Sequence, residues 1–381
     1  MVTIHQSARH YVDDDGSVHD YEVTLLKALN AVKRIILVAH HATAPIGPRL
    51  THALPYFEKY FGSYDANKAA RVKAVLDKLY QLVENETEVD ITFHVGSKHL
   101  SGATEVFIKD TNKNVECVID LSKRNAFDHN GTYQPSSQAL LPEDTGRFDG
   151  AHNTDLQAFS TGSGSRHLGF KSGSQIFINP RNFHESDCLA PIEGERIVKE
   201  ADLIDDYHKL PALLLHELCH SSIMGPAEEQ FDDEHAFPDT ISKTLPDEIT
   251  VQFNGRTDQP QPLYGDRWCS LVANCGRPEE SRKCLKNPDS YQYFILSIYM
   301  KYLNWCFRDG SAKSVNVNGT TGAKLSSSSA FLGNQLNVVF RGEEMSLDEA
   351  LTAASPPNNQ IGTFSSMAPF GAPQPPRGCM I

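Results

Sequence analysis

Apolar side chains recur every three or four positions in two long segments near the start of the chain, residues 20–40 and 66–83. This spacing places them on one face of an α-helix and leaves charged residues on the other face. Further helices are predicted over residues 202–224, 267–273 and 288–307. We interpret these segments as helices whose apolar faces contribute to a common core.

Short runs of apolar residues, typical of β-strands, lie between the early and the late helices. They cover residues 90–95, 104–108, 115–121 and 175–178 and are separated by Gly, Asn and Ser. Helices, then strands, then helices again predict an α+β fold that is mostly helical and has a small sheet.

Differences in composition predict how the chain is divided. A helical segment, residues 1–50, precedes the main domain, residues 51–310, which carries a polar insertion at 122–174. A C-terminal extension follows at 311–352. The remaining residues, 353–381, hold six of the 21 prolines and are expected to form a flexible tail.

The net charge and the hydropathy of the chain argue against two classes of partner, nucleic acids and membranes. The 48 acidic and 35 basic residues give a net charge of −13, which argues against nucleic acid because its binding needs a basic face. If the negative charge were concentrated near a cleft, it would favour a basic substrate. No apolar run is long enough to predict a membrane span.

The first twenty residues lack the basic start and apolar stretch of a secretory signal. We therefore expect a cytoplasmic protein. The alternative is a secreted protein whose signal lies outside the printed sequence. Cys275 and Cys284 could form a disulfide if the protein is exported.

The segment His216-Glu217-Leu218-Cys219-His220 contains the pattern His-Glu-x-x-His within an apolar run. On a helix, residues four apart share a face, so both imidazoles can reach one ion such as Zn²⁺. Glu217 can then act as general base toward a metal-activated water. Cys219 is a less suitable ligand, because the same helical turn leaves little angular room for it.

A catalytic zinc site usually has three protein ligands. The metzincin continuation is excluded because its third histidine would fall at Ala227. Spacing alone does not rank the downstream candidates, which are Asp232, Asp233, Glu234, His235, Asp239 and Asp258.

Five segments in order resemble the deuterolysin-like aspzincin zinc metallopeptidases, a fungal-type family that includes the lysine-specific metalloendopeptidases. They are residues 55–72, 175–180, 216–220, 264–271 and 287–294. The fourth contains Tyr-Gly-x-x-x-Cys, and the fifth begins Asn-Pro-Asp-Ser-Tyr. The resemblance covers about residues 50 to 307 and implies a zincin-like catalytic domain.

The resemblance also implies roles for individual residues. Asp258 corresponds to the third zinc ligand beside His216 and His220, although it precedes Tyr264 by six residues where the family motif has three. Tyr264 corresponds to the tyrosine that stabilises the oxyanion, and Glu217 to the general base. The implied protein is a monomeric zinc endopeptidase that acts on a peptide or protein.

Two alternatives stay open. Two histidines and one carboxylate also suit iron, which would give a metal-dependent enzyme of another reaction type, acting on a small peptide or a biosynthetic substrate. The scaffold could also bind zinc in an interaction protein that has lost turnover.

Overall fold

The computed structural model describes residues 1–12, 16–43, 50–87, 89–96, 106–110, 115–119, 157–161, 174–191, 198–224, 231, 234–236, 261–303, 305–308, 311–314 and 336–354.

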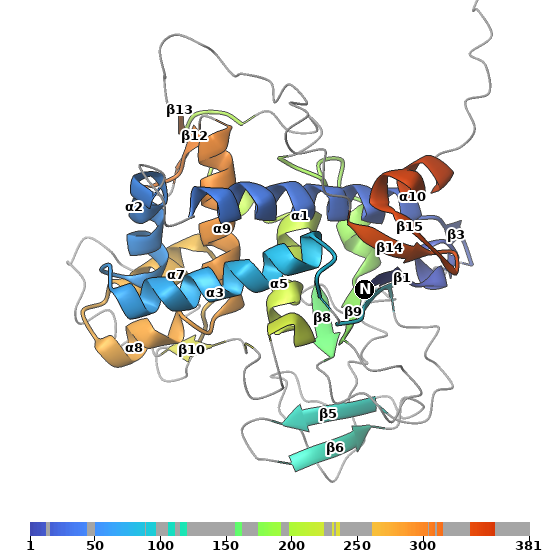
Figure 1. Ribbon diagram of the computed structural model, residues 1–381, viewed down its shortest axis with the longest axis horizontal. Coiled ribbons are helices and arrows are strands. Elements are labelled where there is room, and N and C mark those ends of the chain that lie inside the picture. Colours follow the sequence, from blue (N-terminus) through green and yellow to red (C-terminus); the bar gives the residue numbers. More distant parts are fainter. Residues whose placement is uncertain are drawn as a thin grey trace, which may run out of the picture.

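A mixed sheet of six strands, counted among the described residues, forms one side of the fold (Figure 1). Its four central strands run parallel, and each edge strand is antiparallel to its neighbour. In spatial order the strands are β15 (Glu343–Ser346), β14 (Asn337–Phe340), β1 (Val2–Ile4), β4 (Ile91–Val95), β9 (Ser174–Ile178) and β8 (Ala158–Thr161).

The strands predicted at 90–95 and 175–178 are confirmed as β4 and β9, which pair with each other over five positions. The other two predicted strands form a separate antiparallel hairpin, β5 (Val106–Asp110) with β6 (Val115–Ile119). The sequence patterns did not indicate β1 or β14. These strands pair in the register Val2 to Val338, so the two ends of the described chain meet in one sheet.

Helices cover the sheet and form the larger part of the fold, which agrees with the predicted α+β class. The segments predicted at 20–40, 66–83 and 267–273 are confirmed as α1, α3 and α7. The helix predicted at 288–307 is confirmed as α9 only as far as Tyr302, because Trp305–Cys306 pair as a strand instead. The α-helices are α1 (Glu22–Ala42), α2 (Leu50–Phe61), α3 (Ala66–Val83), α5 (Leu210–His220), α7 (Asp266–Ala273), α8 (Pro278–Lys283), α9 (Pro288–Tyr302) and α10 (Leu347–Ala354).

Shorter elements connect these parts. The predicted helix over 202–224 is divided into α5 and two flanking 3-10 turns, because Pro211 begins a new helix and the Ser221 backbone is extended. The 3-10 turns are Gln6–Ala8, Pro180–Phe183, Ile204–Tyr207 and Ser222–Met224. The two-residue strands are β2 (Tyr11–Val12), β3 (Val18–His19), β10 (His235–Ala236), β11 (Gln261–Pro262), β12 (Trp305–Cys306) and β13 (Lys313–Ser314).

Helix α5 lies in the centre of the fold, packed against α1, α9 and strand β8. Every residue of α5 except His220 is buried, as expected for a helix that is apolar on most of its faces. Aromatic rings of α2 and α9 extend this core, and Phe61 lies 5.3 Å from Phe294 and 5.0 Å from Tyr291 between ring centroids. The helix that carries the His-Glu-x-x-His pattern is therefore held on several sides.

Several predicted segments fall mainly outside the described residues. These are the polar insertion at 122–174, apart from β8 and the start of β9, and the tail at 353–381, apart from the end of α10. Cys275 and Cys284 are buried free thiols. In the part of the chain that the structure describes, no helix combines the length and apolar character that a membrane span requires.

Candidate metal centre

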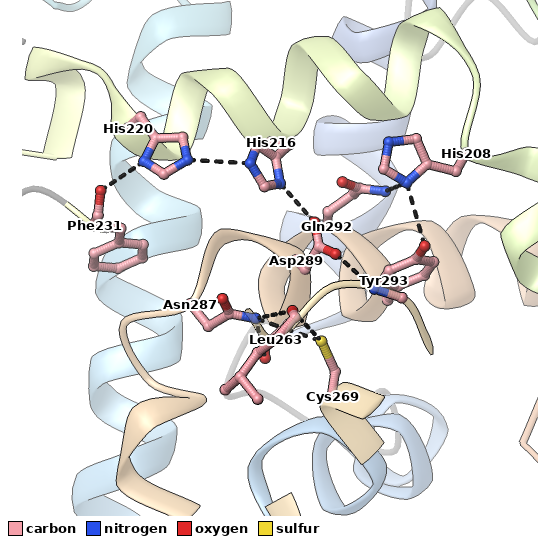
Figure 2. Close-up of polar contacts among 12 residues, drawn as sticks. His208, His216, His220, Phe231, Leu263, Cys269, Asn287, Asp289, Gln292 and Tyr293 are labelled. Atoms are coloured by element: carbon pink, nitrogen blue, oxygen red, sulfur yellow. Dashed lines mark hydrogen bonds and ion pairs between the residues drawn. The ribbon is translucent and has the colours of Figure 1, made fainter. Parts of the chain in front are cut away.

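His216 and His220 lie on successive turns of α5 with their rings directed toward each other. Their Nε2 atoms are 3.1 Å apart, and the ring planes make an angle of 63° (Figure 2). Two nitrogen ligands of a tetrahedral zinc ion, each about 2.0–2.1 Å from the metal, stand about 3.3 Å apart. The histidine pair therefore already has nearly the spacing that one ion requires.

The far side of each ring is held by an oxygen atom. Nδ1 of His220 donates to the main-chain carbonyl of Phe231 at 2.7 Å, because a carbonyl only accepts. Nδ1 of His216 lies 2.6 Å from Oδ1 of Asp289, and an ionised carboxylate also only accepts. In the neutral rings both protons thus reside on Nδ1, and two Nε2 lone pairs face each other.

Such an arrangement calls for a positive charge between the rings. Two lone pairs at 3.1 Å repel each other unless a cation or a proton lies between them. Metal-binding histidines in proteins characteristically donate their other N–H to a carboxylate or a main-chain carbonyl, which fixes the tautomer and the ring orientation. Both kinds of partner are present here.

Asp289 joins three parts of the site. It lies in the first turn of α9, is 1% exposed, and accepts the main-chain N–H of Gly265 at 2.8 Å through Oδ2. Gly265 has φ +88°, a conformation that other residues rarely adopt. One carboxylate therefore orients His216 on α5 and also fixes the backbone just before α7.

A buried ion pair holds the same backbone from the other side. Asp266, the first residue of α7, has Oδ1 2.7 Å from Nζ of Lys59 and 2.5 Å from the hydroxyl of Tyr60. Burial raises the pKa of Asp266, and Lys59 opposes that rise. The position of Tyr264, just before this segment, is thus set by contacts with both α2 and α9.

Tyr264 lies beside the histidine pair, as its expected role requires. Its ring centroid is 6.3 Å from that of His216, and half of its surface is exposed to solvent. Glu217, the expected general base, follows His216 on α5 and is 4% exposed. The structure therefore places the two histidines and Tyr264 together, with Glu217 on the same helix.

No candidate for a third ligand is described beside the histidine pair. Asp258, Asp232, Asp233 and Asp239 lie outside the described residues, and for His235 the structure describes the backbone only, in β10. Glu234 is described and half-buried, and its carbonyl accepts the N–H of Leu263 at 2.8 Å. Within the described part of the chain, no group of three His, Cys, Asp or Glu side chains forms a metal site.

Cys219 does not take part in the histidine pair. It is fully buried, and this burial raises the pKa of its thiol well above the usual range. A protonated thiol is a poor metal ligand. Cys219 thus packs as a small apolar residue in the core.

Two residues near the site were not singled out from the sequence as functional. One is Asp289, whose only sequence signal was its place in the segment Asn-Pro-Asp-Ser-Tyr. The other is His208, whose Nδ1 lies 3.2 Å from both the Tyr293 hydroxyl and the Gln292 amide nitrogen. Burial lowers the pKa of His208, so its ring is neutral near pH 7.

No protein-family model, curated protein or solved structure matches the chain.

Proposed function

We propose that this protein is a zinc-dependent peptidase with a zincin-like fold, and that His216 and His220 are two of the protein ligands of the ion. The observation that carries this proposal is the pair of Nε2 atoms facing each other at 3.1 Å, each ring held by an acceptor at Nδ1. A helix that only needed to pack would not require two buried acceptors to orient two imidazoles on the same face.

The donor set suits zinc. Neutral imidazole nitrogen is a preferred ligand of this ion, and the spacing of the two Nε2 atoms is within a few tenths of an ångström of the tetrahedral value. The proposed third ligand is Asp258, from the resemblance to the aspzincin peptidases. A site with two histidines and one carboxylate keeps a coordination position for water or substrate.

When bound, the zinc ion supplies a Lewis acid that polarises the scissile carbonyl and makes a nearby water more acidic. Glu217 takes a proton from that water as it attacks the carbonyl carbon, and then delivers the proton to the departing amine. The hydroxyl of Tyr264 donates a hydrogen bond to the oxyanion that develops on the carbonyl oxygen. Asp289 keeps His216 in the tautomer that presents Nε2 to the ion.

The test is the metal content of protein purified without chelator, measured together with hydrolysis of casein. We expect one zinc per chain and proteolysis that chelator abolishes and added zinc restores. His216→Ala should lose both, whereas His41→Ala, on an exposed part of α1, should keep both. Stoichiometric iron would contradict zinc chemistry. One zinc per chain without hydrolysis of casein or of short peptides would favour the non-catalytic alternative.

A further inference from the structure

The surface has a large groove in whose described lining cationic side chains outnumber carboxylates. Its volume is about 1320 Å³, and its walls come from the start of α3, the loop between α7 and α8, α8 itself and the segment before α9. Its described lining contains five cationic side chains and three carboxylates. The cations are Lys68, Arg71, Arg282, Lys283 and Lys286. This surface is locally positive in a chain whose net charge is −13.

Five cations against three carboxylates leave the described lining with a formal excess of two positive charges. Lys283 pairs with Glu280 at 2.8 Å, but among the described residues no carboxylate lies within ion-pairing distance of the other four cations. One carboxylate of the lining, Asp65, has another role, since it accepts the N–H groups of Asn67 and Lys68 at the start of α3. The groove therefore attracts an anionic ligand.

The walls of the groove are held by main-chain contacts. The Asn274 amide donates to the carbonyls of Glu58 and Lys59 at the end of α2, at 3.1 and 2.9 Å. The Ser281 hydroxyl donates to the carbonyl of Ala273 at 3.0 Å. A groove fixed in this way loses little conformational entropy when a ligand binds.

Phe231 and Tyr291 connect the histidine pair to a residue of the groove. The Phe231 carbonyl holds His220, and the Phe231 ring stacks on Tyr291 with 5.0 Å between centroids. Burial raises the pKa of Tyr291, and Arg71, which lines the groove, opposes that rise through a side-chain hydrogen bond to Tyr291. Lys286, another residue of the lining, precedes Asp289 by three residues.

We propose that this groove binds an acidic stretch of the peptide substrate, so that the enzyme selects substrates carrying Glu or Asp near the cleaved bond. The proposal rests on the proposed peptidase function for its biological meaning. An acidic substrate is the opposite of the basic substrate that the net charge alone led us to expect. The distribution of charge matters more than its sum, because salt screens charges beyond about 8–10 Å.

A peptide fits these observations better than a nucleic acid. The overall charge of −13 repels a long polyanion, whereas a few spaced carboxylates interact mainly with the local cations. The lining also includes the ring of Tyr64, 48% exposed, which suits contact with peptide side chains.

The test measures binding by fluorescence anisotropy, with full-length Glu217→Gln protein so that the probe stays intact. The probes are labelled peptides of alternating Gly and Glu, with matched Gly-Gln and Gly-Lys peptides and a single-stranded oligothymidylate of equal length. We expect the Glu peptide to bind most tightly and its affinity to fall as salt is raised from about 0.01 to 0.15 M.

Charge reversal then locates the binding surface. Arg282→Glu with Lys286→Glu, both exposed, should weaken binding of the Glu peptide about tenfold. The control is Arg9→Glu with Arg308→Glu, which are also exposed, make the same change in net charge and lie outside the groove; it should change affinity by less than about twofold. Lys286→Gln provides a milder variant if the double reversal does not fold.

Several outcomes would overturn the proposal. One is that the Glu peptide does not bind at about 1 mM. Another is that the Gln peptide, the Lys peptide or the oligothymidylate binds as tightly as the Glu peptide. A third is that the control reversals weaken binding of the Glu peptide as much as the reversals in the groove do. None of these depends on turnover. Zinc content and casein hydrolysis, measured separately, decide the proposed function, so the two proposals can fail independently.

Discussion

Oδ1 of Asp289 lies 2.6 Å from Nδ1 of His216, although 73 positions separate the two residues in the chain. This contact joins the first turn of α9 to the middle of α5 in the buried centre of the protein. It gives His216 a defined tautomer and orientation.

Asp289→Asn should weaken zinc affinity about 10- to 100-fold, because the neutral amide is a weaker acceptor and makes His216 a less basic ligand. Zinc affinity is measured by competition with a chromophoric chelator. The matched control is Asp77→Asn, which alters another histidine–carboxylate pair, since Asp77 lies 2.7 Å from Nε2 of His40. Equal loss of affinity in both variants would show that Asp289 has no particular role in the metal site.

Glu217→Gln should retain one zinc per chain while hydrolysis of casein falls at least about a hundredfold, the usual contribution of a positioned general base. The amide has nearly the same shape as the carboxylate but does not accept the proton of the attacking water. Metal content and activity are measured on the same preparation. Unchanged activity would remove Glu217 from the mechanism.

Asp258→Ala should reduce zinc affinity more than about a hundredfold, because it removes one of three protein ligands. Asp232→Ala, Asp233→Ala and Glu234→Ala should each leave zinc affinity within a few-fold of the unmodified protein. If one of these three released the metal while Asp258→Ala retained it, the correspondence with the aspzincin motif before Tyr264 would be wrong.

Gly62→Ala should destabilise the protein more than Gly16→Ala does. Both glycines have positive φ, +75° and +86°, so each substitution incurs similar backbone strain of about 1–2 kcal/mol. A Cβ on Gly62 would lie 2.6 Å from the carbonyl oxygen of Ala273, whereas a Cβ on Gly16 would meet no atom of the described residues within 4 Å. We expect a further loss of about 1–3 kcal/mol for Gly62→Ala, measured by urea unfolding.

His208→Gln should make stability less dependent on pH below neutrality. Burial lowers the pKa of His208 in the folded protein below its value of 6.5 in the unfolded chain. Neutral His208 therefore makes its full contribution to the free energy of unfolding above pH 6.5. This contribution is lost as the pH falls below 6.5 and through the pKa of the folded protein, because the unfolded state takes up the proton more readily.

The relevant measurement is the free energy of unfolding of metal-free protein between pH 7.5 and 5.5, where one such proton changes stability by up to about 1.4 kcal/mol per pH unit. Replacement of His208 should make this dependence shallower. An unchanged slope would mean that His208 titrates alike in both states.

Features that depend on neighbours along the chain could be predicted from the sequence. The apolar spacing in residues 66–83 predicted α3 with the bounds that the structure has, and two histidines four apart predicted a pair on one face of α5. Strands β4 and β9 followed from their apolar runs. Helical and strand periodicity is local, so a single segment carries enough information to reveal it.

Tertiary structure decided the remaining features, because they depend on segments that are distant in sequence. Val2 and Val338 pair in strands of only three and four residues, too short to show a period. In the sequence, Asp289 is not distinguished from the other acidic residues, which number 48 in all. Its contact with His216 arises only when α9 packs against α5. The groove draws its cations from α3 and from residues 282–286, so its positive charge exists only once these segments lie side by side, whereas the net charge of the chain has the opposite sign.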